Sequence, residues 1–113
     1  KYSYVGKSAN IGEGTIIMHN CVVNADSIIG KNCIINTSSI IEHNTKIGDN
    51  SHVAPGAIVL GHVKIGSNTF IGSGAVLKNG ITIGSNCVIQ AGSFIKKDLK
   101  SGTTIKKWLI KIQ

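Results

Sequence analysis

An aliphatic residue recurs at every sixth position of this 113-residue chain, from Val5 to Ile95, with no break in phase. All sixteen residues of the series are Val, Ile or Leu, and the β-branched types among them favour strands. The fifth position of each six-residue unit, from Ala9 to Leu99, holds a small or apolar residue. A unit this short cannot bury its apolar side alone, so successive units are expected to wind into a solenoid.

The fourth position of each hexad carries the residue types of tight turns. Gly, Asn or Asp stands there in thirteen of the sixteen hexads, as at Gly14, Asn32 and Asn86. These residues tolerate a positive φ angle at low cost. Each hexad therefore predicts a short strand followed by a sharp corner with one left-handed residue, and the whole chain is expected to be an all-β repeat domain.

The composition excludes several other classes of protein. There are 20 Ile against one Trp, two Tyr and two Phe, which suits an aliphatic solenoid core better than a compact globule. No run of 18 apolar residues predicts a membrane span, and no basic and apolar segment ending in a cleavage site indicates a signal peptide. The net charge of +7 rests on lysine without arginine, which argues against nucleic-acid binding. Three cysteines without metal-type spacing fit a reducing compartment, so we expect a cytoplasmic protein.

Over residues 5–100 the pattern resembles the hexapeptide-repeat family. The resemblance implies a left-handed parallel β-helix of triangular section, with 18 residues in each coil and about five coils. Residues i and i+18 would then stack about 4.8 Å apart. We expect the β-helix domain to span residues 1–100 and the tail 101–113, which contains Trp108, to cap the last coil, because an uncovered sheet edge invites aggregation.

The 18-residue spacing indicates which candidate catalytic residues lie inside the coil and which lie next to one another on adjacent coils. Cys21, Cys33 and Cys87 fall at the inward fifth position, where a buried thiol is inert. His43 has Gly61 directly above it in its column, and the missing side chain would leave a backbone N–H beside open space. A base next to a free backbone donor is the minimal equipment for acyl transfer. The alternative is a corner that merely prefers glycine.

The other histidines are interpreted by position. His62 occupies a corner where histidine is an acceptable left-handed residue, and His19 has no companion in its coil. Both are therefore interpreted as ordinary surface residues. His52 is expected at a different corner of the prism from His43, so one chain would not bring these two rings together.

A narrower resemblance covers the runs 35–43, 47–57 and 61–66, which together align without gaps. They are similar to the sialic acid O-acetyltransferases and UDP-4-amino-sugar N-acetyltransferases of bacterial surface-glycan synthesis. The resemblance implies an acetyl-CoA-dependent sugar acetyltransferase that works as a homotrimer, with active sites between subunits and without a metal. It implies His43 as general base, the Gly61 N–H and His52 at the acetyl-CoA thioester, and Asn36 in the acceptor site. Further residues implied for acetyl-CoA binding are Ser73, Ala91 and Lys97.

The chain departs from that family at three places. Asn44 stands where an acidic residue often follows the catalytic histidine, and it supplies a hydrogen bond but no negative charge. The usual Gly-Asn-Pro-Ala-Lys segment near the CoA adenine is replaced by Lys107-Trp108-Leu109-Ile110-Lys111. The family also has an N-terminal nucleotide-sugar-binding domain, which we expect to be absent from this chain, either because it was removed or because the protein is a short relative that holds its acceptor in another way.

Two alternatives stay open. The first is a structural or binding solenoid without chemistry. The second is a zinc enzyme similar to the hexapeptide-type carbonic anhydrases, which hold zinc with three histidines at a subunit interface. The closest same-chain pair for such a site is His43 and His62, diagonal on adjacent coils, with no clear third histidine.

Overall fold

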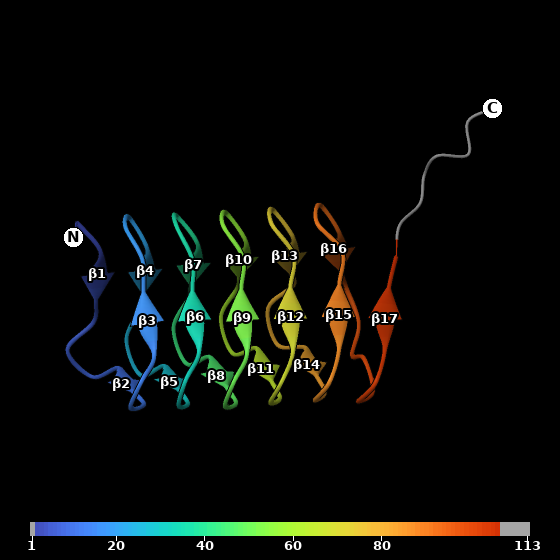
Figure 1. Cartoon of the computed structure of the whole chain (residues 1–113), viewed down its shortest axis with the longest axis horizontal. Helices are drawn as coiled ribbons and strands as arrows, with labels where there is room; N and C mark the ends of the chain where they lie inside the picture. Colours follow the sequence, from blue (N-terminus) through green and yellow to red (C-terminus); the bar gives the residue numbers. More distant parts are fainter. Residues whose placement is uncertain (1, 107–113) are drawn as a thin grey trace.

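The computed structural model describes residues 2–106, and this part of the chain folds into seventeen β-strands of two residues each. The strands form three parallel sheets that run along one rod (Figure 1). The first sheet contains β1 (Tyr4–Val5), β4 (Val22–Val23), β7 (Ile40–Ile41), β10 (Ile58–Val59), β13 (Val76–Leu77) and β16 (Phe94–Ile95). The second contains β2 (Asn10–Ile11), β5 (Ile28–Ile29), β8 (Lys46–Ile47), β11 (Lys64–Ile65) and β14 (Thr82–Ile83). The third contains β3 (Ile16–Ile17), β6 (Ile34–Ile35), β9 (His52–Val53), β12 (Phe70–Ile71), β15 (Val88–Ile89) and β17 (Thr104–Ile105).

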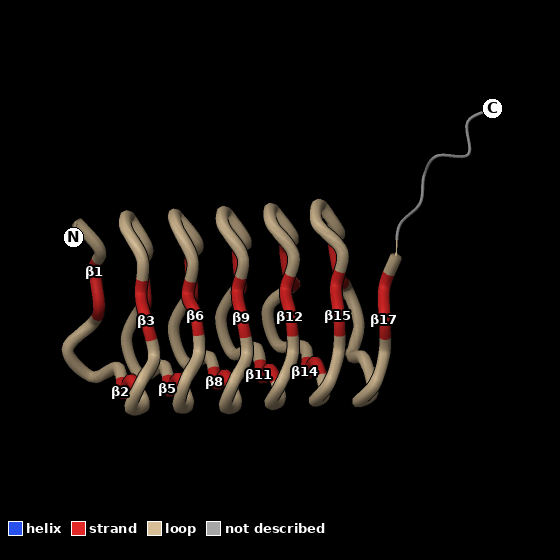
Figure 2. The backbone as a smooth tube through the Cα atoms, in the orientation of Figure 1, coloured by secondary structure: helices blue, strands red, loops and turns tan. Residues whose placement is uncertain are grey.

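Each of the first five turns of the solenoid contributes one strand to each sheet, and corners make up most of its path (Figure 2). A strand pairs with the third strand after it at a spacing of 18 residues, as Ile40 pairs with Ile58 and His52 with Phe70. The described strands make between five and six turns. The predicted all-β parallel coil with 18 residues per turn is confirmed. No helix among residues 2–106 is long and apolar enough to cross a membrane.

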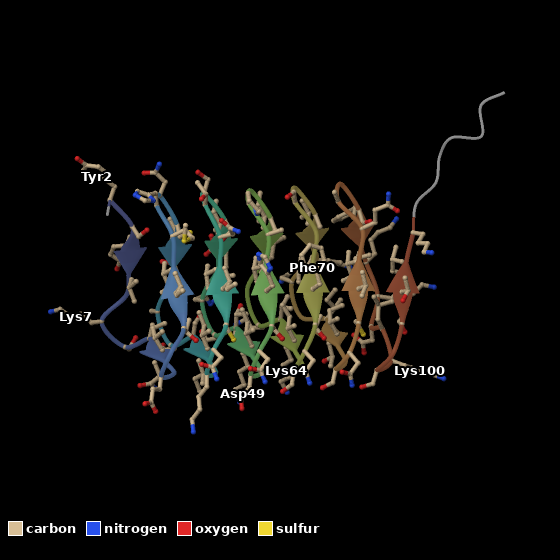
Figure 3. The ribbon with its side chains drawn as sticks, viewed as in Figure 1. Tyr2, Lys7, Asp49, Lys64, Phe70 and Lys100 are labelled. Atoms are coloured by element: carbon tan, nitrogen blue, oxygen red, sulfur yellow. The ribbon has the colours of Figure 1, made fainter. Side chains whose placement is uncertain are left out.

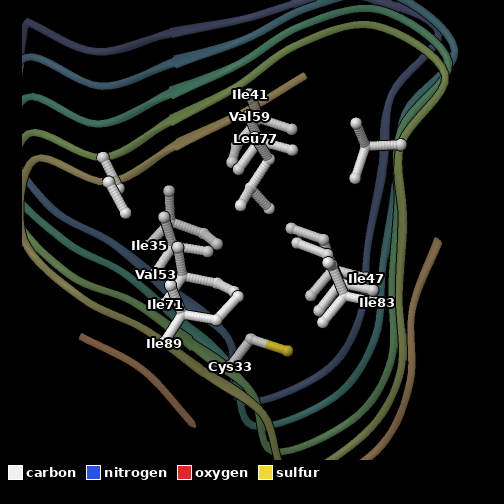
Figure 4. Close-up of a cluster of buried hydrophobic side chains, with 14 of the residues drawn as sticks. Cys33, Ile35, Ile41, Ile47, Val53, Val59, Ile71, Leu77, Ile83 and Ile89 are labelled. Carbon is white, nitrogen blue, oxygen red and sulfur yellow. The ribbon is translucent and has the colours of Figure 1, made fainter. Parts of the chain in front are cut away.

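The core is a set of stacked aliphatic columns, one from each sheet. In every strand the first residue points outward and the second inward, because successive side chains of a strand alternate. From Val23 to Ile95 the inward residues are at most 6% exposed, whereas Ile28, the outward neighbour of Ile29, is 46% exposed. Figure 4 shows the columns Ile41, Val59 and Leu77 of the first sheet, Ile47 and Ile83 of the second, and Ile35, Val53, Ile71 and Ile89 of the third. Cys21, Cys33 and Cys87 are buried and unbridged, as their fifth-position placement predicts.

The corners use the left-handed residues that the fourth position predicts. Fourteen of the sixteen fourth-position residues have a positive φ angle; Ser8 and Asp98 do not. Ser38 and His62 adopt this conformation although neither is among the preferred Gly, Asn and Asp. The corner geometry is therefore imposed by the coil even where the residue type does not favour it.

The last coil differs from the prediction, because it contains sixteen residues instead of eighteen. Ile105 pairs with Ile89, and Leu99 forms a bridge with Ile83, so Leu99 takes an inward first position, not the fifth position expected for it. An unbroken hexad would put the polar Ser101 into the core. Shortening the corner at 96–98 puts Leu99 and Ile105 there, and burial of aliphatic surface favours this register.

The shortened corner changes two further expectations. The strand series reaches Ile105, beyond residue 100, where the sequence analysis ended the β-helix domain. The 18-residue column of His43, Gly61 and Asn79 does not continue to Lys97, which lies in the shortened corner. The Asp98 carboxylate there accepts a hydrogen bond from the Thr82 N–H at 2.8 Å. Trp108 and the remaining tail predicted to cap the coil lie outside the described residues.

Candidate functional site

His43 lies in the corner that joins the first sheet to the second, directly after β7, and is exposed. Its Nδ1 lies 3.1 Å from the side-chain oxygen of Asn44. An amide oxygen only accepts hydrogen bonds, so Nδ1 is the donor in this contact, and in the neutral ring that tautomer leaves the lone pair on Nε2. Asn44 is held by the coil, since it takes the left-handed conformation and its backbone N–H donates to the Ala25 carbonyl at 3.0 Å. The corner thus presents His43 in the tautomer of a base.

Gly61, on the next coil, lies directly against that nitrogen. A Cβ atom added to Gly61 would lie 3.0 Å from His43 Nε2 and 3.1 Å from Cε1, closer than ordinary van der Waals contact. Gly61 itself is buried, so the imidazole occupies the room that the sequence analysis expected to be open. The φ angle of Gly61 is not in the left-handed region, and glycine is required here for the close approach of the ring alone.

The backbone N–H of Gly61 has no hydrogen-bond partner among residues 2–106. At the same position of other corners, a side chain of the next coil accepts this hydrogen bond, as Asp49 does for Lys31 and Ser85 does for Ser67. Asn79 stands above Gly61 and does not do so. A backbone N–H without a partner is the kind of donor that an oxyanion needs.

His52 and Asn36 form a second cluster, on the third sheet. His52 points outward from β9, and its Nε2 lies 3.2 Å from the Asn36 side-chain nitrogen. The Asn36 oxygen already accepts from the Thr37 N–H at 2.7 Å and from the Thr37 hydroxyl at 3.2 Å. Asn36 therefore donates to His52 Nε2, and His52 carries its proton on Nδ1. The structure presents Nδ1–H of His52 as a donor.

Two aromatic neighbours of these histidines were missed by the sequence reasoning. Phe70 follows His52 in the ladder, and the two rings make an edge-to-face contact at 5.2 Å between centroids. Figure 3 shows Phe70 on the outer surface of β12. His62, interpreted as an ordinary surface residue, contacts His43 in the same manner at 5.0 Å. The 18-residue spacing of His52 and Phe70 could have indicated the first contact. The sequence placed His43 and His62 diagonally on adjacent coils, but this proximity was considered only for a pair of zinc ligands.

One chain does not bring the two clusters together. His43, Asn44 and Gly61 lie at the corner between the first and second sheets, whereas His52 lies on the outer face of the third. The buried columns of the core stand between that corner and that face (Figure 4).

The residues expected to bind acetyl-CoA divide between the two sides. Ser73 and Ala91 are exposed and stack in the corner that follows the third sheet, the corner that also contains Asn36. They lie on the His52 side of the rod. Lys97 is exposed in the shortened corner at the end of the first sheet. Among residues 2–106 there is no group of three or more His, Cys, Asp or Glu placed to hold one metal ion.

A three-sided parallel coil of six-residue units is the left-handed β-helix of the hexapeptide-repeat proteins. The chain belongs to the bacterial transferase hexapeptide family (six repeats), whose model matches residues 8–43, 26–61 and 62–97. The membership of the hexapeptide-repeat family that the sequence pattern predicts is thereby confirmed. No match is found among curated protein sequences.

Three solved structures resemble the whole coil closely. The acetyltransferase domain of PglB from Neisseria gonorrhoeae FA1090 is 34% identical with a TM-score of 0.90, over 90% of this chain and 50% of that one. PerB from Caulobacter crescentus, solved with CoA and GDP-perosamine, is 34% identical with a TM-score of 0.89, over 90% and 49%. WeeI from Acinetobacter baumannii AYE is 28% identical with a TM-score of 0.89, over 92% and 51%. The present chain thus spans about half the length of these proteins.

Proposed function

We propose that this β-helix is the catalytic part of an acetyl-CoA-dependent sugar acetyltransferase. The acceptor is an amino or hydroxyl group of a sugar, most simply a nucleotide-linked sugar of bacterial surface-glycan synthesis in the cytoplasm. The observation that carries the proposal is the His43 ring, with Nδ1 at the Asn44 oxygen and Nε2 against Gly61, whose backbone N–H has no partner among residues 2–106. It is supported by similarity to an acetyltransferase domain and to a perosamine N-acetyltransferase, the latter solved with CoA and GDP-perosamine.

The proposed reaction is direct attack on the thioester. The acceptor nitrogen or oxygen forms a bond to the carbonyl carbon of acetyl-CoA, and His43 Nε2 takes the proton that the nucleophile loses. The Gly61 N–H donates to the carbonyl oxygen while that oxygen carries negative charge. The carbon–sulfur bond then breaks, and the proton passes from His43 to the departing CoA thiolate. The products are acetylated sugar and free CoA.

The second half of the site comes, in this proposal, from another copy of the chain. His52 Nδ1–H is an available donor for the thioester, and Asn36, which orients that ring, would line the acceptor site. Because His52 and His43 lie on opposite sides of one rod, a complete site needs the third sheet of one copy against the His43 corner of the next. A closed ring of three copies satisfies this arrangement at every corner.

The outer faces of the rod support such packing. The outward residues of the first and third sheets are mostly apolar, including Tyr4 at 57%, Phe94 at 55% and Ile16 at 54% exposure. The second sheet instead presents Lys46, Lys64 (Figure 3) and other polar residues alongside Ile28. Contiguous apolar surface on two of three faces is typical of an interface between subunits.

For acetyl-CoA we propose the path from Gly61 and His52 along Ser73 and Ala91 toward the last coils. Lys97 is the lysine proposed for the CoA phosphates, and its neighbours in the last described coil, Lys96, Lys100 and Lys106, are also exposed. Their charge attracts phosphate groups.

A free-thiol assay of CoA release, run over UDP-amino sugars, GDP-amino sugars and sialic acids, tests the proposal. One acceptor is expected to give turnover, and His43→Ala is expected to lose about 10²–10⁴-fold in kcat. His19→Ala, an exposed corner histidine in another coil, is the matched control and should keep wild-type turnover. Full transfer by His43→Ala to that acceptor would refute the role of the base.

A further inference from the structure

His62 is joined to His43 both through the backbone and through the side chains. Its backbone N–H donates to the His43 carbonyl at 3.0 Å, and the two imidazoles meet edge to face, at an interplanar angle of 89° and 5.0 Å between centroids. The two residues lie on successive coils, displaced by one position along the corner. His43 therefore has Asn44 at its Nδ1, Gly61 at its Nε2 and the ring of His62 against it.

The corner itself does not need an imidazole at position 62. His62 has a φ angle of 61°, a conformation that the other fourth-position corners assign almost entirely to Gly, Asn and Asp. Its side chain is exposed, so burial of apolar surface does not account for it. Only the ring contact with His43 distinguishes His62 from the Asn and Gly residues that make the same turn elsewhere.

The position of the His43 ring needs a second contact. The terminal torsion of a histidine is broad and roughly two-fold, so a ring can rotate and exchange Nε2 with a carbon position. One hydrogen bond from Asn44 holds a single ring atom, and a neutral amide holds it less strongly than a carboxylate would. Glu42 does not assist, because its carboxylate accepts a hydrogen bond from Asn24 at 2.9 Å, on the coil below. An aromatic edge against the ring restricts the remaining rotation.

We infer that His62 is a positioning residue, whose ring, together with Asn44, keeps His43 Nε2 against Gly61. The expected effect of His62 on turnover rests on the proposed function. The expected effect of His62 on the orientation of the His43 ring does not. The orientation and the tautomer of His43 can be measured without any substrate. The two kinds of failure are therefore separable.

The test uses His62→Asn, because asparagine keeps the left-handed corner and removes only the ring. Nitrogen-15 NMR of the imidazoles is expected to show one tautomer for His43 in the wild type, with the proton on Nδ1, and a mixture of tautomers in His62→Asn. Turnover is expected to fall about tenfold, since small displacements of a catalytic group are costly. The KM for acetyl-CoA and the melting temperature should stay near wild type, which a merely structural role for His62 would not produce.

His19→Asn removes an exposed corner histidine elsewhere and serves as control, with His43 signals and turnover both unchanged. Asn44→Gly keeps the turn, removes the acceptor at Nδ1 and should give the same mixture of tautomers as His62→Asn. The inference is overturned if His62→Asn leaves the His43 spectrum as in the wild type, whether or not an acceptor has been found. If His62→Asn changes the His43 spectrum but keeps full turnover, His62 positions the ring, and the claim that this position affects catalysis is refuted.

Discussion

Gly61→Ala offers the sharpest test of the site, because the structure gives the size of the perturbation. The new Cβ would lie 3.0 Å from His43 Nε2, where carbon and nitrogen atoms in contact normally keep about 3.5 Å or more. The ring must therefore withdraw by about half an ångström. His43 is the exposed end of a side chain and can move, so little folding energy is lost. The φ angle of Gly61 is not in the left-handed region, and alanine therefore adds no strain of that kind there.

The expected result is a separation of activity from stability. Turnover should fall about tenfold or more, since a displacement of about 1 Å in an active site can cost about 100-fold. The free energy of unfolding, measured with urea, should change by less than about 1 kcal/mol, because alanine also restricts the unfolded chain. Gly72→Ala is the matched contrast: its Cβ would clash with the Ala91 backbone nitrogen, which cannot move away as a side chain can, and should destabilise the coil strongly.

A double-mutant cycle completes the experiment. If Gly61→Ala acts through the base, it should have no further effect on kcat in a His43→Ala background. Two results would refute the reasoning: wild-type turnover by Gly61→Ala, or a turnover loss that is as large with alanine at position 43 as with histidine.

The other predictions concern the partners of the two histidines and the core. Asn44→Asp keeps the left-handed corner and adds the charge that stabilises a protonated His43, so kcat should rise several-fold; an unchanged or lower kcat at equal melting temperature would contradict this. Asn36→Ala removes the donor to His52 Nε2. Because a hydrogen bond contributes about 1 kcal/mol, the KM for acetyl-CoA in initial-rate measurements should rise about fivefold. A KM equal to that of the wild type would argue against His52 as a thioester donor. Ile29→Ala should cost about 2–5 kcal/mol in urea unfolding, whereas Ile28→Ala, the outward residue of the same strand, should cost less than about 1 kcal/mol; similar costs would mean that the two faces of β5 are not distinguished.

Most of the fold could be predicted because the hexad acts on the chain locally. An aliphatic residue every six positions fixes which side chains point inward, and Gly, Asn or Asp at the fourth position fixes where the chain turns. The last coil could not be predicted this way. Leu99 and Ile105 are themselves six residues apart, so the repeat continues in a shifted phase, and only strand pairing shows that the corner at 96–98 has lost two residues.

The site divides along the same line. The column of His43 and Gly61 follows from the 18-residue coil, and so does the separation of His43 from His52. The contacts at the corners do not follow from it, because corner side chains choose rotamers according to neighbours in the next coil. Contacts between neighbouring coils determine three features of the site. These are the hydrogen bond of Asn36 to His52, the ring contact of His62 with His43, and the imidazole of His43 that fills the space beside Gly61.

By itself the sequence determined a parallel β-solenoid with an aliphatic interior and, at one corner, a histidine stacked against a glycine of the next coil. The tertiary structure decided the register of the last coil, the tautomers of His43 and His52, and the contact of the His62 ring with the proposed base His43. The contact of His43 with Asn44 joins neighbours in the chain but depends on the side-chain conformations at the corner. For the rest the physical reason is range: inward and outward directions are set by backbone geometry within one hexad, whereas the pairing of the last coil and the contacts of His52 and His62 join residues 16 to 19 positions apart, on different coils.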